Sequence, residues 1–254
     1  MRYQTLNCFD VDHIHDLRVA SRRLRGAIDQ LGPCIGAERM ERLQRPIKRL
    51  TRKLGVLRNL DEAQLYFENK GNQGLESLLV SLRNQRRQEA ATTKQMLERV
   101  DCMKLERKIR SAAGTVVTPD NIASQGLLAI LSERNLELYR PIHALVPLAA
   151  GPKMVEERHS LRIALKKWRY FNELLHDMLG KQQSALLDLL RQYQALLGDM
   201  NDREVFTVLL DEAADLPETV RDAIKNDIVR EQRKLLKKLC VLLDTKPLAY
   251  QFEL

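Results

Sequence analysis

The chain has 254 residues, of which 30% are charged and only 5% are aromatic. Its 42 Lys and Arg residues outnumber its 34 Asp and Glu residues, and the resulting net charge of +8 favours an anionic partner. The chain is long enough to bury a core, and it has neither a signal peptide nor an apolar run that could cross a membrane, so we expect a cytoplasmic protein.

The cysteines show no spacing that is typical of a metal site or a disulfide framework. The four residues Cys8, Cys34, Cys102 and Cys240 are scattered along the chain. A reducing compartment is therefore expected, with no metal and no cofactor.

Good helix formers dominate the sequence, and no alternating run of β-branched residues suggests a sheet, so we predict an all-α fold. Caps, Gly-Pro steps and apolar periodicity predict helices over about residues 12–31, 37–69, 74–111, 121–148, 153–180, 182–214 and 217–243. The first of these should stop at Gly32-Pro33, and the fourth should kink or split at Arg140-Pro141. A linker at 113–119 divides the chain into two expected bundles, residues 1–114 and 120–254.

The first predicted helix has a basic face that contains a histidine. On a helical projection, the basic side chains fall within about 80° of His15 on either side. They are Arg18, Arg22, Arg23 and Arg25. Apolar side chains occupy the opposite side, so the helix is amphipathic, with a packing face and a candidate binding face.

The same pattern returns 144 positions later, which indicates an internal duplication. Each basic position recurs, as His159, Arg162, Lys166, Lys167 and Arg169, opposite Leu161, Ala164, Trp168 and Leu175. The correspondence continues into the next two helices. Residues 54–55 and 58–61 match 197–198 and 201–204, and residues 83–87 match 230–234.

Arg86 lies on the apolar side of its predicted helix, where an unpaired guanidinium would be costly. It therefore has either an internal acid as its partner, with Asp61 the obvious candidate, or an anionic ligand. The sequence leaves both alternatives open.

These repeated motifs resemble the CHAD family, the conserved histidine α-helical domain. The resemblance rests on His15-x-x-Arg18-x-x-x-Arg22-Arg23-x-Arg25, its second copy from His159 to Tyr170, and Leu-Gly followed by Asn59 or Asp202. It implies two four-helix bundles related by a pseudo-twofold axis, with basic residues lining a groove or pore between them. It also implies non-catalytic binding of inorganic polyphosphate, an association with polyphosphate granules, and a separate CYTH-type triphosphatase or other polyphosphate-metabolising protein as a partner.

The sequence departs from the family pattern in two places. The helix that normally precedes the first histidine helix is missing or clipped, so we expect the first bundle to have three helices or to borrow one from a second copy in a homodimer. The second copy is also less basic, because Ala195 stands at the position of Arg52 and only Arg191 matches Lys48.

Taken together, the repeats and the resemblance predict a set of polyphosphate-binding residues. They are His15, Arg18, Arg22, Arg23, Arg25, Lys48, Arg52, Arg86, His159, Arg162, Lys166, Lys167, Arg169, Tyr170, Arg191 and Arg233. Arg and Lys in rows along a rigid helix suit a polyanion without bases to read. We expect the two histidines to donate hydrogen bonds to phosphate and to take up protons when the anion binds.

Three alternatives compete with polyphosphate binding. The basic faces could simply be solvated, or they could bind nucleic acid, although few aromatic residues are available for stacking on bases. A metal-dependent phosphoanhydride hydrolase is the third alternative, because acids gather on the sixth predicted helix. They are Asp199, Asp202, Glu204, Asp211 and Glu212. The first copy lacks most of these acids, so we expect no enzyme.

Overall fold

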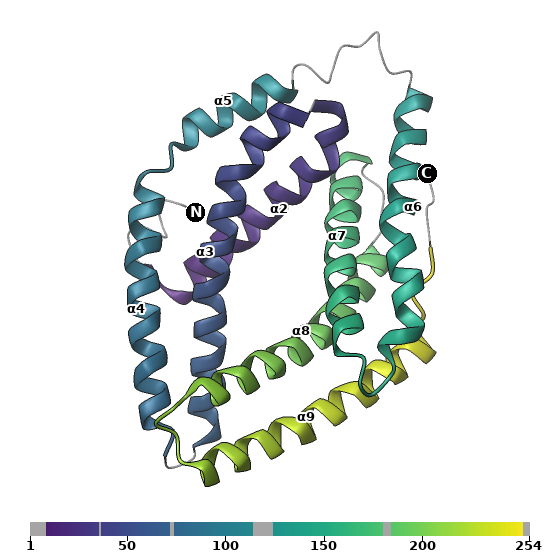
Figure 1. The fold of residues 1–254 in the computed structure, drawn as a ribbon. Coiled ribbons are helices and arrows are strands. Elements are labelled where there is room, and N and C mark those ends of the chain that lie inside the picture. The colour runs from purple at the N-terminus through teal and green to yellow at the C-terminus, as the bar shows by residue number, and fades with distance from the viewer. Residues whose placement is uncertain (1–8, 36, 72–73, 114–123, 180–183, 251–254) are drawn as a thin grey trace. The chain divides into compact units, whose positions relative to one another are not determined.

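The computed structural model describes residues 9–35, 37–71, 74–113, 124–179 and 184–250 (Figure 1). Every regular element among these residues is an α-helix, which confirms the predicted all-α class. The helices are α2 (Val11–Ile35), α3 (Ala37–Lys70), α4 (Glu76–Glu98), α5 (Cys102–Ala113), α6 (Ser124–Ala149), α7 (Val155–Leu179), α8 (Ser184–Glu212) and α9 (Glu218–Thr245).

Two predicted boundaries are wrong, and a helix that was expected to kink or split does not split. Helix α2 continues past Gly32-Pro33 to Ile35, because Ile28 packs on Leu43 and Ile47 just before this point and stabilises the last turns. Helix α6 passes through Pro141 and Pro147 without splitting. The helix predicted over 74–111 is two helices.

The break between α4 and α5 has a clear local cause. The carboxylate of Asp101 accepts a hydrogen bond of 2.8 Å from the backbone N–H of Lys104, so Asp101 caps a new helix. The caps expected at Asp120 and Asn121 lie outside the described residues.

The chain divides into two compact units. The first comprises Met1–Thr118 and Glu212–Arg221, and the second comprises Pro119–Asp211 and Asp222–Leu254. The short segment that connects α8 to α9 thus groups with the first unit.

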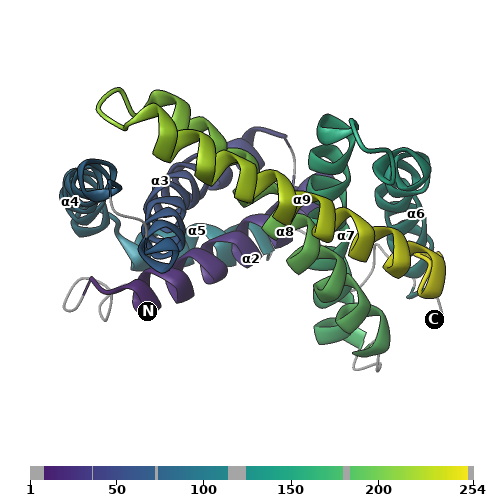
Figure 2. The same ribbon diagram turned by 90° about the horizontal axis from the view of Figure 1, so that it is seen from below.

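In the first unit, α3 lies between α2 and α4 in both ribbon views (Figures 1 and 2). One core cluster joins Ile14 and Leu17 of α2 to Leu54 and Leu57 of α3 and to Leu97 of α4. A second cluster, around Ile28, Leu43 and Ile47, is covered by α5. These contacts bury the apolar face predicted for the first helix and leave its basic face uncovered by the core.

In the second unit, α6 and α7 run side by side, and a larger core is built around Trp168, which is fully buried. The indole Nε1–H donates to Asn135 Oδ1 at 2.7 Å. Tyr139 packs on Trp168 and Tyr250, with ring centroids 5.2 and 5.4 Å apart, and its hydroxyl donates to the Leu248 carbonyl at 2.8 Å. The C-terminal segment therefore packs on the first helix of this unit.

The hydroxyl of Tyr193 joins α8 to the end of α9. It lies 3.0 Å from the Leu242 carbonyl oxygen and 2.8 Å from that of Lys246. Burial raises the pKa of Tyr193 to about 12, so the hydroxyl keeps its proton and remains a donor.

Candidate anion-binding site

Helix α2 presents the predicted basic face to solvent. The side chains of His15 and Arg23 are exposed, and those of Arg18, Arg22 and Arg25 are partly exposed. On the opposite side, Leu17 and Ile28 are buried at 8% and 5% exposure. The amphipathic pattern read from the sequence is therefore the arrangement that the helix adopts.

Helix α3 adds two exposed cations, Lys48 and Arg52, one turn apart. The residue before Arg52 is Thr51, whose Oγ1 lies 3.2 Å from Ser21 Oγ of α2, while each hydroxyl also donates to a carbonyl of its own helix. Since Ser21 directly precedes Arg22, the two helices meet at this contact next to one basic residue on each.

Arg86 of α4 has an internal partner. Its Nε donates to Asp61 Oδ1 of α3 at 2.5 Å, and the carboxylate and guanidinium side chains are 6% and 23% exposed. Of the two alternatives for Arg86, the structure provides the ion pair with Asp61. A contact of Arg86 with a ligand remains a prediction.

Helix α7 carries the second basic face. His159 and Lys167 are exposed there, and Arg162, Lys166 and Arg169 are partly exposed. The expected packing residues on its other side are buried; they are Leu161, Ala164, Trp168 and Leu175.

Arg169 and Tyr170 form part of a local cluster at the end of this basic face. The Arg169 guanidinium lies 3.4 Å from Glu173 and 5.1 Å from the centre of the Tyr170 ring. Part of the positive charge of Arg169 is thus already compensated by a carboxylate, and its geometry is fixed by two neighbours on the same helix.

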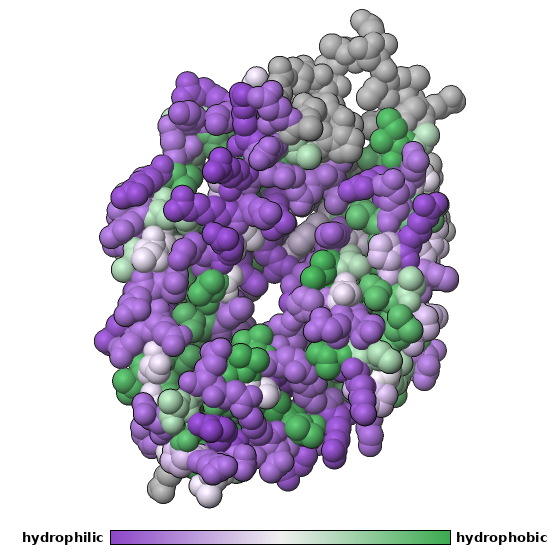
Figure 3. Space-filling model, viewed as in Figure 1, coloured by the Kyte–Doolittle hydropathy of each residue, from purple (hydrophilic) through white to green (hydrophobic). Residues whose placement is uncertain are grey.

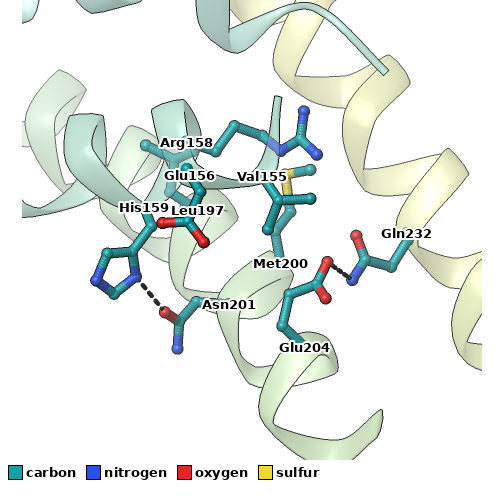
Figure 4. A pocket seen from close by; sticks show the side chains of 9 residues that line it. All are labelled: Val155, Glu156, Arg158, His159, Leu197, Met200, Asn201, Glu204 and Gln232. Carbon is teal, nitrogen blue, oxygen red and sulfur yellow. Dashed lines mark hydrogen bonds between the residues drawn. The ribbon is translucent and has the colours of Figure 1, made fainter. Parts of the chain in front are cut away.

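Asn201 of α8 connects the histidine and the first arginine of this face. Its Oδ1 lies 3.0 Å from His159 Nδ1 and 3.0 Å from Arg162 Nη2 (Figure 4 draws the bond to His159). Sequence reasoning used Asn201 only to align the repeats and missed it as a site residue. The sequence signal that could have identified Asn201 is that the second copy has an amide where the first copy has Arg58.

A cavity of about 250 Å³ opens beside this group. It is lined by Val155, Glu156, Arg158, His159, Leu197, Met200, Asn201, Glu204 and Gln232 (Figure 4). An adjoining cavity of about 350 Å³ shares Arg158, Glu204 and Gln232 and adds Arg233 of α9. Arg233, predicted from the repeat, thus lines the second cavity, and His159 lines the first.

Arg158 was also missed. It lies at the position of Ile14 in the repeat, is only 6% exposed, and donates hydrogen bonds to the carbonyls of Ala149, Gly151 and Pro152 at 3.4, 2.6 and 3.4 Å. Burial lowers the pKa of Arg158, and the negative charges of Glu204 and Glu157 oppose this shift. A guanidinium has a far higher ordinary pKa than the working pH, so Arg158 stays charged.

Arg191 is placed differently from the other predicted residues. Its side chain is 53% exposed and is ion-paired with Asp188 on its own helix. Among the described residues, the structure records no contact between Arg191 and the basic face of α7.

Several acids of α8 already have partners of their own. The carboxylate of Glu204 accepts from the Gln232 amide at 2.7 Å, and Asp211 pairs with Lys225. Burial raises the pKa of Asp199, which the positive charge of Arg203 opposes. Within the described parts of the chain, no three His, Cys, Asp or Glu side chains are grouped as metal ligands.

The surface shown in Figure 3 is mainly hydrophilic, with scattered apolar side chains. None of the described helices combines the length and the apolar character that crossing a membrane requires.

The fold matches a known class of helical domain. The profile of the CHAD domain family matches residues 3–211, which is most of the chain, so this protein belongs to the CHAD family. Its fold is similar to the crystal structure of the CHAD domain from the plant Ricinus communis, with a TM-score of 0.73 and 21% sequence identity. The similarity covers 96% of this chain and 85% of the plant chain. No curated protein matches this chain.

Proposed function

We propose that this protein binds inorganic polyphosphate without catalysis, through the basic faces of α2 and α7. The observation that carries the proposal is that each face places one histidine and four cations on the solvent side of a helix whose other side is buried. Membership of the CHAD family supports the same function.

The spacing of the charges suits a linear polyanion. The Cβ atoms of residues three and four apart on a helix lie about 5–6 Å from each other, so successive phosphates of one chain can reach the charged ends of these side chains in turn. Arginine can give two parallel hydrogen bonds to one phosphate, and lysine adds a compact charge. A rigid helix holds these groups in place before the ligand arrives, which lowers the entropy cost of binding.

The test is calorimetric titration of the full chain with long-chain polyphosphate, tripolyphosphate and a DNA oligomer. We expect tight binding of long polyphosphate only, and a loss of at least about tenfold in affinity in the double variant Arg22→Ala/Lys166→Ala, because each lost charge-assisted contact weakens binding. The control is Arg110→Ala/Arg230→Ala, which removes the same charge from two exposed, ion-paired positions outside the basic faces.

Equal binding of all three polyanions, or equal effects of the two double variants, would show that the basic faces act only as general surface charge. Tight binding of DNA alone would favour the nucleic-acid alternative.

A further inference from the structure

The amide of Asn201 can have only one orientation. Arginine donates hydrogen bonds and never accepts them, so the amide atom that lies 3.0 Å from Arg162 Nη2 must be the oxygen. At its other end, the amide nitrogen faces the carboxylate of Asp202 at 3.5 Å, where only a donor fits. Both ends of the side chain therefore give the same assignment.

This orientation determines which nitrogen of His159 carries the proton. The Asn201 oxygen that accepts from Arg162 also lies 3.0 Å from His159 Nδ1, so Nδ1 must donate. A neutral imidazole has a single N–H, and the other nitrogen, Nε2, is then a hydrogen-bond acceptor. In this neutral state the lone pair of Nε2 would face the lone pair of a phosphate oxygen, so the two atoms cannot form a hydrogen bond.

We propose that Asn201 is a positioning residue that makes His159 bind an anion only as an imidazolium, so that ligand binding takes up a proton at this site. The proposal rests on the proposed function, since it takes polyphosphate as the anion. The balance is simple: one proton moves from solvent to Nε2, and the Nε2–H then donates to a phosphate oxygen, while Nδ1–H stays on Asn201.

The charges around His159 come from three helices and are mixed in sign. Helix α7 contributes Glu156, Arg158 and Arg162, and α8 contributes Asp202 and Glu204. From α9, the charged Arg233 and the neutral amide Gln232 line the adjoining cavities. The carboxylates favour an imidazolium and the guanidiniums oppose it. The bound anion is the charge that changes between the two states, and its approach is what favours the second proton.

The first unit supplies an internal control. No described residue forms a hydrogen bond with the ring of His15, which is exposed. The position that matches Asn201 holds Arg58, which is ion-paired with Glu62. The neutral ring of His15 can therefore carry its proton on either nitrogen and can donate to phosphate without a second one.

The first experiment needs no ligand. Nitrogen NMR of the imidazoles in the full chain, above the pH at which the histidines are charged, reports the tautomer of each ring, with His159→Gln assigning the signal. We expect His159 to carry its proton on Nδ1 in the wild type and to move toward the Nε2–H form in Asn201→Leu, which removes the acceptor. A wild-type His159 with its proton on Nε2 would overturn the proposal, whatever the protein binds.

The second experiment measures proton uptake. Long-chain polyphosphate is titrated calorimetrically at one pH in buffers of different ionisation enthalpy, and the slope of the observed enthalpy gives the protons bound. We expect wild-type uptake to exceed that of His159→Gln by up to about one proton, with affinity falling up to about tenfold per pH unit as His159 loses its charge. His15→Gln should keep most of the wild-type uptake, and Asn201→Leu should lose the part that His159→Gln loses.

The outcomes separate the two proposals. If polyphosphate does not bind at all, the proposed function fails, and the NMR result still decides the tautomer. If polyphosphate binds tightly with equal proton uptake in the wild type and His159→Gln, the function stands and the inference about Asn201 is overturned.

Discussion

Arg158 is a buried cation where the first repeat has the apolar Ile14, and its partners are backbone carbonyls instead of a carboxylate. The three carbonyls belong to Ala149, Gly151 and Pro152, at the end of α6 and in the turn that follows. The last carbonyls of a helix have no partner within the helix, and a guanidinium supplies both donors and a favourable charge there. Arg158 thus fixes the start of α7, and with it His159, to the end of α6.

Replacing Arg158 should cost stability. In Arg158→Met the three carbonyls lose the guanidinium donor while remaining partly buried, although the Gly151 carbonyl keeps the backbone N–H of Met154, and we expect the free energy of unfolding to fall by about 1–3 kcal/mol. Urea denaturation followed by circular dichroism measures the change. The control Arg230→Ala, at a side chain that is 68% exposed, should stay within about 0.5 kcal/mol of wild type. An unchanged midpoint for Arg158→Met would show that the three bonds contribute nothing.

At the scale of the elements, three ion pairs connect the antiparallel helices α3 and α4. Lys53 pairs with Glu89 and Arg83 with Glu68, both at 2.8 Å, and Asp61 pairs with Arg86 between them. The outer pairs are considerably more exposed than the Asp61 carboxylate, so water screens them. Most of the electrostatic contribution to this helix pair should come from the middle pair.

A double-mutant cycle tests this ranking. Asp61→Asn leaves the Arg86 guanidinium without its charge partner, and we expect a loss of about 1–3 kcal/mol in the free energy of unfolding. Arg86→Met combined with Asp61→Asn should lose less than the sum of the two single variants. The matched variant Glu68→Gln, in the exposed pair, should cost under about 1 kcal/mol. Equal losses for Asp61→Asn and Glu68→Gln would contradict the ranking.

Most of the helices could be predicted because their apolar residues recur at the helical period. The stripe predicted for α3 is an example: Leu43, Ile47, Leu54 and Leu57 are buried, and Leu50 is partly buried. The errors arose where a local signal competed with packing. Pro33 indicates a helix end, but the contacts of Ile28 outweigh it, and Asp101 was not recognised as a cap because the flanking sequence is helical on both sides.

The candidate site was less predictable than the fold. Helical spacing places His159, Arg162 and Lys166 on one face, since that requires only the geometry of a single helix. The partners of these residues come from other helices, and no periodicity encodes them. Asn201 and Gln232 reach the site from α8 and α9, and they become visible only when the three helices are packed together.

At the scale of the whole molecule, the excess of cations should control how binding responds to salt. A polyanion that replaces condensed counterions at several Lys and Arg side chains releases those ions, so the logarithm of the affinity falls linearly with the logarithm of the salt concentration.

We expect polyphosphate affinity to fall by at least about tenfold between 50 and 200 mM NaCl, which corresponds to several released counterions. Arg22→Ala/Lys166→Ala should reduce the steepness of this dependence, whereas Arg110→Ala/Arg230→Ala should change it little. Fluorescence titrations at four salt concentrations provide the slopes. A slope near zero would show that recognition depends on something other than charge.

The contact between Tyr139 and the Leu248 carbonyl has a consequence for how the protein is made. The contacts that join α2 to α5 are mainly between neighbours in the chain, so these helices can begin to pack before the rest of the chain is made, and the first unit later gains only the short segment Glu212–Arg221. The second unit must wait, since α6 is completed by the segment around Leu248 and Tyr250. During translation the part of Tyr139 that Leu248 and Tyr250 cover therefore stays open for more than a hundred residues of synthesis, long after Trp168 of α7 has been made, and chaperones have their longest opportunity to bind there.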